Sequence, residues 1–456
     1  MHNIGELLPV WSIIPFVGML LSIAIVPLVK PEWWEHNLLK VSILWSLLFL
    51  IPFGIAYGAK VLTFNLLEIV LLDYVPFIVL LLGLFVAAGG IALKGTLAGT
   101  PKVNLAILLI GTLLASWIGT TGAAMLFIRP IIRANKWREK KAHVVIFFIF
   151  MVANIGGSLT PVGDPPLFLG FLRGVPFFWT MKLLPLMLMN IAILSVLFFI
   201  IDSRAYKKEL AAGRSPKDVM AAGEKEPLKI EGAHNFIFIG MIVFTVILNG
   251  KLGMMDSLKD ENGMTIGLDV FEGIRLQINW FVQIIFILIA ALLSMKTTKK
   301  TTRELNAFTF APIKEVAELF IGIFITMIPA LALLHAHGAE LGLSSPWHFF
   351  WATGVLSSFL DNAPTYLVFM TTAASLGSTT GLTTAVGTIL PINLIAVSAG
   401  AVFMGANTYI GNAPNFMVKA IAEENKIKMP SFFGYMLWSI SILIPIFILD
   451  TLVFFR

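Results

Sequence analysis

The chain has 456 residues, of which 58% are hydrophobic and 13% are charged, and apolar runs long enough to cross a bilayer recur along it. This composition excludes a soluble globular fold and predicts an all-α polytopic membrane protein. The chain contains no cysteine, which excludes disulfides, thiolate metal sites and thiol catalysis. The net charge of +6 does not indicate nucleic-acid binding, because basic residues gather in the cytoplasmic loops of membrane proteins.

Eight uninterrupted apolar segments predict transmembrane helices, since each approaches the roughly 20 residues that a hydrocarbon core requires. They lie near residues 11–29, 39–57, 75–91, 178–201, 236–250, 276–294, 316–334 and 432–455. The first segment lacks a basic leader and a small-residue cleavage site, so we expect it to be retained. Before the third segment, Glu68 and Asp73 suit the polar face of an interfacial helix.

Loop charges predict the orientation in the membrane. Lysines and arginines are concentrated in residues 129–141, 204–229 and 296–314, which should be cytoplasmic, whereas residues 251–275 have an acidic balance and should face outward. The only long polar stretch, residues 202–235, is predicted to be a cytoplasmic linker. It separates a first half, 1–201, from a second half, 236–456.

Four further apolar segments are interrupted by small, polar or proline residues, and the interruptions match between the halves. "SWIGTTGAAMLF" from Ser116 pairs with "SSFLDNAPTYLV" from Ser357, and "GSLTPVGDPPLF" from Gly157 pairs with "GANTYIGNAPNF" from Gly405. An odd number of crossings is predicted in each half, so we expect two inverted repeats. Each repeat would hold a re-entrant hairpin, at about 103–133 and 347–376, and a broken helix, at about 144–173 and 384–424.

The breaks indicate a binding site. Backbone groups freed by a broken helix cost several kcal/mol in lipid, so a break persists only where protein, water or an ion satisfies them. Asp164 and Asp361 lie at two breaks, and an ionised carboxylate at a helix centre costs roughly 2.5 to 3.5 kcal/mol on insertion scales, so such residues usually mark ion or proton pathways. The alternative is that each only caps the half-helix that follows it.

Small polar residues accompany these carboxylates and offer the neutral oxygens that hard cations bind. Hydrogen bonding between helices is the alternative role for each of them. Asn415 lies among them, and the predicted ion- or substrate-binding residues are Asp164, Asp361, Asn154, Ser158, Thr160, Gly163, Thr120, Thr121, Asn362, Thr365, Asn407, Thr408, Gly411 and Asn412. The sodium ligands within this set are expected to be Asp164, Asp361, Asn362 and Asn407.

Three of the interrupted segments carry a resemblance to a known family. "ANIGGSLTPVGDPP", "SSFLDNAPTY" and "GANTYIGNAPN" resemble signature segments of the ion transporter superfamily, which includes NhaD-type sodium/proton antiporters, arsenite permeases, and citrate and dicarboxylate carriers. The similarity in the order of membrane spans and interrupted segments covers nearly the whole chain. It implies a scaffold domain, often dimerising, beside a transport domain of two hairpins and two broken helices that moves like an elevator. The hairpin tips would be 119–123 and 361–365.

The hairpin tips depart from one branch of that superfamily. Dicarboxylate carriers usually show a Ser-Asn-Thr triplet at both tips, whereas this chain has "GTT" and "DNAPT". An aspartate in each half instead suits sodium/proton antiport. In this hypothesis deprotonated Asp164 and Asp361 bind sodium, and protonation from the opposite side releases it. The alternative is a sodium-coupled carboxylate carrier of the citrate type, or another anion transporter of the superfamily.

The remaining expectations concern chemistry and location. No phosphate loop, serine nucleophile elbow or HExxH motif occurs, so we expect a transporter and not an enzyme. No cofactor is expected beyond sodium and protons as transported or coupling ions. The expected partners are small inorganic ions, with a carboxylate anion as the alternative, membrane lipid and a second copy of the chain. A bacterial inner membrane is the simplest location.

Overall fold

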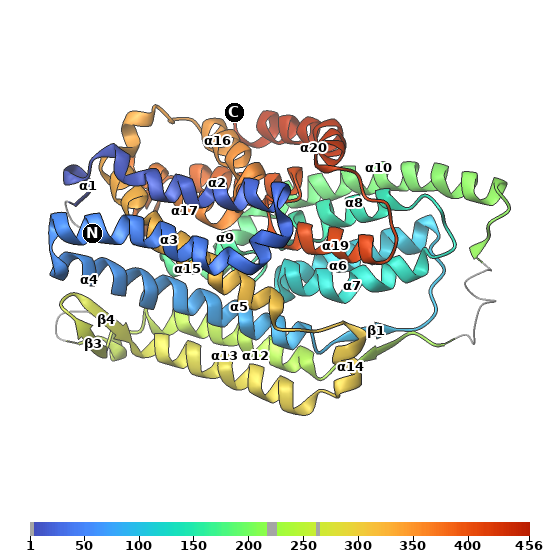
Figure 1. Cartoon of the computed structure of the whole chain (residues 1–456), viewed down its shortest axis with the longest axis horizontal. Coiled ribbons are helices and arrows are strands. Elements are labelled where there is room, and N and C mark those ends of the chain that lie inside the picture. The colour runs from blue at the N-terminus through green and yellow to red at the C-terminus, as the bar shows by residue number, and fades with distance from the viewer. Residues whose placement is uncertain (1–3, 217–225, 261–264) are drawn as a thin grey trace.

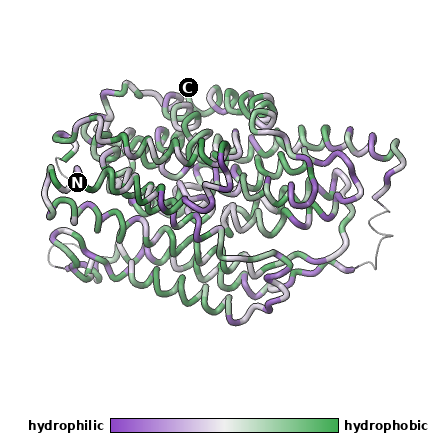
Figure 2. Tube along the Cα trace, viewed as in Figure 1, coloured by the Kyte–Doolittle hydropathy of each residue, from purple (hydrophilic) through white to green (hydrophobic). Residues whose placement is uncertain are grey.

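A computed structural model describes residues 4–216, 226–260 and 265–456. Within these residues, nine helices are long and apolar enough to cross a membrane, which shows an all-α, multi-pass membrane protein. The long helices lie roughly along the longest axis of the molecule (Figure 1). Hydrophobic residues dominate these helices, whereas hydrophilic residues are frequent in the segments at the two ends of that axis (Figure 2).

The first half of the chain is almost entirely helical. Its helices are α1 (Ile4–Leu7), η1 (Val10–Ile13), α2 (Ile14–Val29), α3 (Pro31–Tyr57), α4 (Ala59–Glu68), η2 (Ile69–Tyr74), α5 (Val75–Ala88), α6 (Pro101–Ile118), α7 (Thr120–Ala134), α8 (Ala142–Met151), η3 (Ile155–Gly157), α9 (Pro165–Leu172), η4 (Phe177–Leu183) and α10 (Leu184–Ala211).

The second half is also mainly helical. Its helices are α12 (Asn235–Leu252), η5 (Asp256–Leu258), α13 (Ile278–Thr297), α14 (Lys300–Leu305), α15 (Ala311–His337), η6 (Gly338–Leu341), α16 (Pro346–Phe359), α17 (Asn362–Ser375), α18 (Pro391–Met404), η7 (Gly405–Asn407), α19 (Ala413–Glu424) and α20 (Phe432–Phe454).

The residues that the structure describes also form three short antiparallel strand pairs outside the helices. They are β1 (Ala92–Lys94) with β2 (Lys229–Glu231), β3 (Gly267–Phe271) with β4 (Ile274–Gln277), and β5 (Leu382–Thr384) with β6 (Gly387–Ile389). Strands β3 and β4, from the acidic loop, lie at the opposite end of the molecule from β1 (Figure 1). Part of the predicted linker 202–235 is structured, because α10 continues to Ala211 and β2 pairs with β1. Residues 217–225 of the linker lie outside the described residues.

The expectation of an interfacial helix before the third span was wrong for Asp73. Helices α4, η2 and α5 form one continuous helix, Ala59–Ala88, in which Asp73 is buried. Arg173, at the end of α9, forms an ion pair with Asp73 at an N–O distance of 2.5 Å. A buried carboxylate is tolerated when a partner charge and hydrogen bonds replace water, and hydropathy alone did not reveal this partner.

Two helical hairpins and two interrupted helices form the centre of the molecule. The turn between α6 and α7 is Gly119, whose φ of +80° disfavours residues with a Cβ atom. Extended residues Leu360 and Asp361 separate α16 from α17. Helix α7 of the first hairpin packs on α19, and α17 of the second packs on α9. The two halves of the chain therefore interlock around their breaks.

Candidate ion-binding site

Asp164 lies where the four interrupted segments meet. It is the N-terminal cap residue of α9, and only 1% of its surface is exposed. Its Oδ1 accepts hydrogen bonds from Thr120 Oγ1 at 3.0 Å and from Asn412 Nδ2 at 3.1 Å, and its Oδ2 accepts one from Asn362 Nδ2 at 2.7 Å. All three donors are neutral. The carboxylate is therefore hydrogen-bonded without a balancing cation among the described side chains.

The two half-helices α9 and α19 begin side by side. Asn412 caps α19 at the position that matches Asp164 in the aligned motifs, and its amide bonds to the Asp164 carboxylate. Asn154 accepts a hydrogen bond from Asn412 at 3.2 Å and donates one to Asn415 Oδ1 at 2.7 Å. Helix N-termini carry partial positive charge, so both half-helices stabilise an anion between them.

The hairpin tips each contribute one donor to this carboxylate. Thr120 is the first residue of α7 and Asn362 is the first residue of α17. The backbone N–H of Thr120 also donates to the Gly163 carbonyl oxygen at 2.8 Å, which ties the first tip to the first broken helix. Asp164, in the first broken helix, thus receives hydrogen bonds from both hairpin tips and from the second broken helix.

Several of the predicted ligands donate hydrogen bonds to backbone oxygens at the helix breaks. Thr160 donates to the Ser116 carbonyl oxygen, and Thr408 donates to the Ser358 carbonyl oxygen. Asn415 donates to the Gly405 and Thr408 carbonyl oxygens at 2.8 and 3.0 Å. These contacts satisfy backbone oxygens that the interrupted helices leave free. Sequence reasoning did not assign Ser116 and Ser358 a role, although both lie within the matched motifs.

The two predicted carboxylates differ in their surroundings. Asp361 is only partly buried; its Oδ1 accepts the backbone N–H of Ala363 at 3.0 Å, and its carbonyl oxygen accepts the Thr365 hydroxyl at 2.9 Å. It therefore caps α17, as the alternative interpretation foresaw. Thr121, at the other tip, is also only partly buried.

Three buried side-chain oxygens near the breaks have no hydrogen-bond partner among the described residues. They are Ser158 Oγ, Asn362 Oδ1 and Asn407 Oδ1. Leaving a buried polar atom unpaired costs about 1 to 3 kcal/mol, so each is available to a ligand or a water. Neutral oxygens beside a carboxylate suit a hard cation such as sodium. Among the described residues, no group of three or more His, Asp or Glu side chains offers a transition-metal site.

Glycines allow the broken segments to pack closely. A Cβ atom at Gly411 would lie 2.6 Å from the Gly405 carbonyl oxygen and 2.7 Å from that of Ser357, and one at Gly163 would collide with the Gly157 carbonyl oxygen. The obstructing atoms are backbone atoms in both halves, so they cannot rotate away.

Gly163→Ala and Gly411→Ala are therefore expected to destabilise the protein by the roughly 1 to 3 kcal/mol typical of overpacking. Gly240→Ala in α12 is the matched control, because its Cβ would meet no atom within 4 Å. The measurement is the thermal unfolding midpoint in detergent. Equal midpoints for Gly163→Ala and Gly240→Ala would contradict this account of the close contacts.

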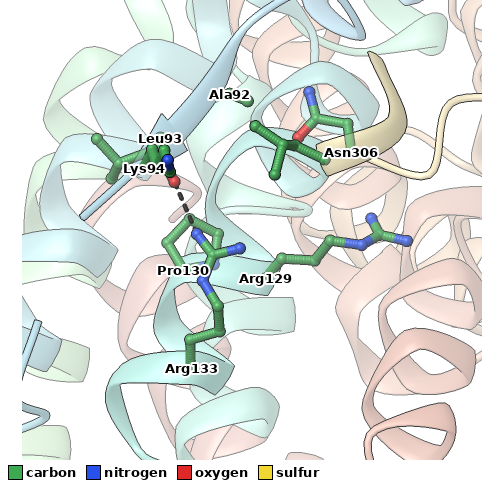
Figure 3. A pocket seen from close by; sticks show the side chains of 8 residues that line it. Ala92, Leu93, Lys94, Arg129, Pro130, Arg133 and Asn306 are labelled. Atoms are coloured by element: carbon green, nitrogen blue, oxygen red, sulfur yellow. Dashed lines mark hydrogen bonds between the residues drawn. The ribbon is translucent and has the colours of Figure 1, made fainter. Parts of the chain in front are cut away.

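A basic pocket lies apart from Asp164. Arg129 and Arg133 of α7 line it with Lys94 and Leu93 of β1 (Figure 3), and Arg133 donates to the Leu93 carbonyl oxygen at 2.7 Å. Arg129 is nine residues beyond Thr120 in α7, roughly 13 Å along the helix axis. These arginines therefore belong to the base of the hairpin and not to the site at its tip.

Comparison with protein families identifies the class of protein. Residues 5–455 match the family described as "Putative citrate transport", and the chain belongs to this family, which is part of the ion transporter superfamily. Comparison with curated proteins finds no match. Together, the family and the membrane helices support a secondary transporter that is an integral, multi-pass membrane protein.

Proposed function

We propose that this protein is a sodium/proton antiporter in which Asp164 binds the two cations alternately. The observation that carries the proposal is a buried carboxylate held by three neutral donors, with unpartnered oxygens of Ser158, Asn362 and Asn407 at the same breaks. Burial favours the protonated acid, whereas the hydrogen bonds and a bound cation favour the carboxylate. Protons and sodium ions therefore compete for one group.

The exchange follows from this competition. On one side of the membrane sodium binds the Asp164 carboxylate with neutral oxygens around it, and on the other side a proton replaces it. Asp361 precedes Asn362, which donates to Asp164, and keeps the tip of the second hairpin in place by accepting a hydrogen bond from the Ala363 N–H. Inward movement of protons then drives sodium out of the cytoplasm, in the orientation that the basic loops predict.

The geometry also suggests which parts move. In the proposed elevator motion, two inverted repeats each supply a hairpin and a broken helix to a transport domain, which moves against a dimeric scaffold. Helices α2, α3, α5, α12, α13 and α15 pack on one another and would form the scaffold. The Asp73–Arg173 ion pair joins the α4–α5 helix to the end of α9, across the proposed boundary.

The second candidate is sodium-coupled transport of citrate or a similar carboxylate, which the family description favours. Sodium would again bind at the breaks, and the N-termini of the half-helices would bind the anion. No described lysine or arginine contacts the Asp164 carboxylate, so a citrate trianion would depend on sodium ions and helix dipoles for its charge balance.

A flux measurement separates the two candidates. The purified protein is reconstituted in vesicles that contain a pH-sensitive dye, and sodium, potassium or citrate is added in turn. Antiport predicts a rapid internal pH change with sodium and none with potassium. If sodium evokes no proton movement but labelled citrate accumulates only in its presence, antiport is wrong and the protein is a citrate carrier.

A further inference from the structure

A second buried carboxyl group lies between α10 and α20. Asp450 of α20 and Asn190 of α10 are both fully buried, and Asn190 Nδ2 donates a hydrogen bond to Asp450 Oδ2 at 3.0 Å. The other two oxygens of this pair, Asp450 Oδ1 and Asn190 Oδ1, have no hydrogen-bond partner in the part of the chain that the structure describes. These two oxygens require an explanation, because burying a polar atom without a hydrogen-bond partner costs free energy.

The surroundings do not stabilise an anion. Among the described residues no lysine, arginine or histidine forms an ion pair with Asp450. Asp450 is four residues from the last residue of α20, where the helix dipole is negative. From α16, Trp351 donates its indole N–H to Thr451 Oγ1 at 2.9 Å and not to Asp450.

The titratable groups of the neighbouring elements lie elsewhere along the chain. Asp202 is twelve residues beyond Asn190 in α10, roughly 18 Å along the axis. Segment η7 contacts α20 near Tyr435 and Ser439, three or more turns from Asp450. The other titratable residues of α10 lie beyond Asp202, and His143 of α8 pairs with Asp202. The remaining groups on or next to the packed elements are Lys102 of α6, Lys182 of η4, His348 of α16 and Arg456 at the chain end, and none of these described cations forms an ion pair with Asp450.

We propose that Asp450 and Asn190 form a proton-binding site, distinct from Asp164. A carboxylic acid and a primary amide form two hydrogen bonds in one ring: the amide N–H donates to one acid oxygen, and the acid O–H donates to the amide oxygen. The first bond is present, and a proton on Asp450 Oδ1 supplies the second by joining the two unpartnered oxygens. One proton thus satisfies both atoms and removes the buried charge.

Neither a different amide orientation nor a sodium ion explains the pair as well. If the amide of Asn190 is turned over, its oxygen faces Asp450 Oδ2, and only a protonated carboxyl can donate to it. Sodium would have two unpartnered side-chain oxygens here, fewer than a hard cation normally gathers. The buried charge, the existing amide bond and the two unpartnered oxygens all match a single proton.

Infrared spectroscopy of the reconstituted full-length protein tests the site. At neutral pH, wild-type protein should show a carbonyl stretch of a protonated carboxylic acid that Asp450→Asn lacks. Asp450→Asn should fold, because two amides form the same ring without a proton. The exchanged double variant Asn190→Asp/Asp450→Asn restores an acid–amide pair and should recover the band. A loss of carboxylate absorption instead of acid absorption in Asp450→Asn would overturn the proposal, and so would a band that the exchanged variant fails to recover.

The consequence for transport rests on the proposed proton coupling. If the Asp450 proton exchanges during the cycle, Asp450→Asn should alter the pH at which sodium-evoked proton flux is half-maximal, and the exchanged variant should restore it. An unchanged pH profile would show that the proton is held permanently and would overturn its role in exchange. Absence of flux in wild-type protein would contradict antiport, whereas the infrared result does not depend on flux.

Discussion

Asp164→Asn is expected to reduce sodium-evoked proton flux to the level of protein-free vesicles. The substitution keeps the size of the side chain at the start of α9, but an amide cannot bind and release a proton or balance the charge of a sodium ion. In the variant, Thr120 and Asn412 can still donate to the amide oxygen, and Asn362 can turn its amide so that its unpartnered Oδ1 accepts from the new N–H group, so the variant should insert and fold. The flux assay with the pH-sensitive dye measures the effect.

Two further variants complete this experiment. Glu423→Gln removes an exposed carboxylate from α19, the helix that Asn412 caps, and should leave flux unchanged. Asp361→Asn should retain the helix cap, since Asp and Asn cap about equally well, and should lose only the part of the activity that depends on its charge. Full flux in folded Asp164→Asn would rule out Asp164 as the exchanging group.

Asp202→Asn is expected to have the largest effect on stability. Asp202 in α10 forms a buried ion pair with Arg138, and its Oδ1 lies 2.8 Å from His143 Nε2. Its Oδ2 accepts a hydrogen bond from Asn104 at 3.0 Å. Removing one partner of a buried ion pair leaves the other charge uncompensated and costs about 3 to 5 kcal/mol.

Equilibrium unfolding in mixed micelles measures this loss of free energy. The control is Glu304→Gln, which breaks the exposed pair with Lys300, where the N–O distance is 4.0 Å. Exposed pairs contribute about 0 to 1 kcal/mol, so the control should unfold almost like the wild type. Similar unfolding of the two variants would mean that the Arg138–Asp202 pair does not stabilise the fold.

Sequence information was sufficient for features that are local. Glycine, proline and aspartate within an apolar run can be seen without knowledge of any partner, because the residues that interrupt a helix are part of the segment itself. The breaks near Gly119, Asp164 and Asp361 were found in this way, and the helices of the structure are interrupted there. The transmembrane helices could also be predicted from the sequence, since the length and hydropathy of a segment determine whether it can cross a bilayer.

The roles of individual side chains were harder to predict from the sequence. Thr160 and Thr408 stay predicted ion ligands, and the structure adds that their hydroxyls donate to the backbone oxygens of Ser116 and Ser358, which the sequence did not show. Asp164 and Asp361 looked equivalent, whereas one receives three side-chain hydrogen bonds and the other caps its own helix. A motif gives the residue type but not the direction in which its side chain points.

The sequence by itself determined a polytopic α-helical membrane protein with paired helix breaks that carry carboxylates. Only the tertiary structure decided which groups meet: Thr120, Asn362 and Asn412 around Asp164, Arg173 beside Asp73, and Asn190 beside Asp450. The reason is physical. Hydropathy and helix breaking act within a segment, whereas each of these pairs joins residues far apart in the chain and exists only because particular helices pack together.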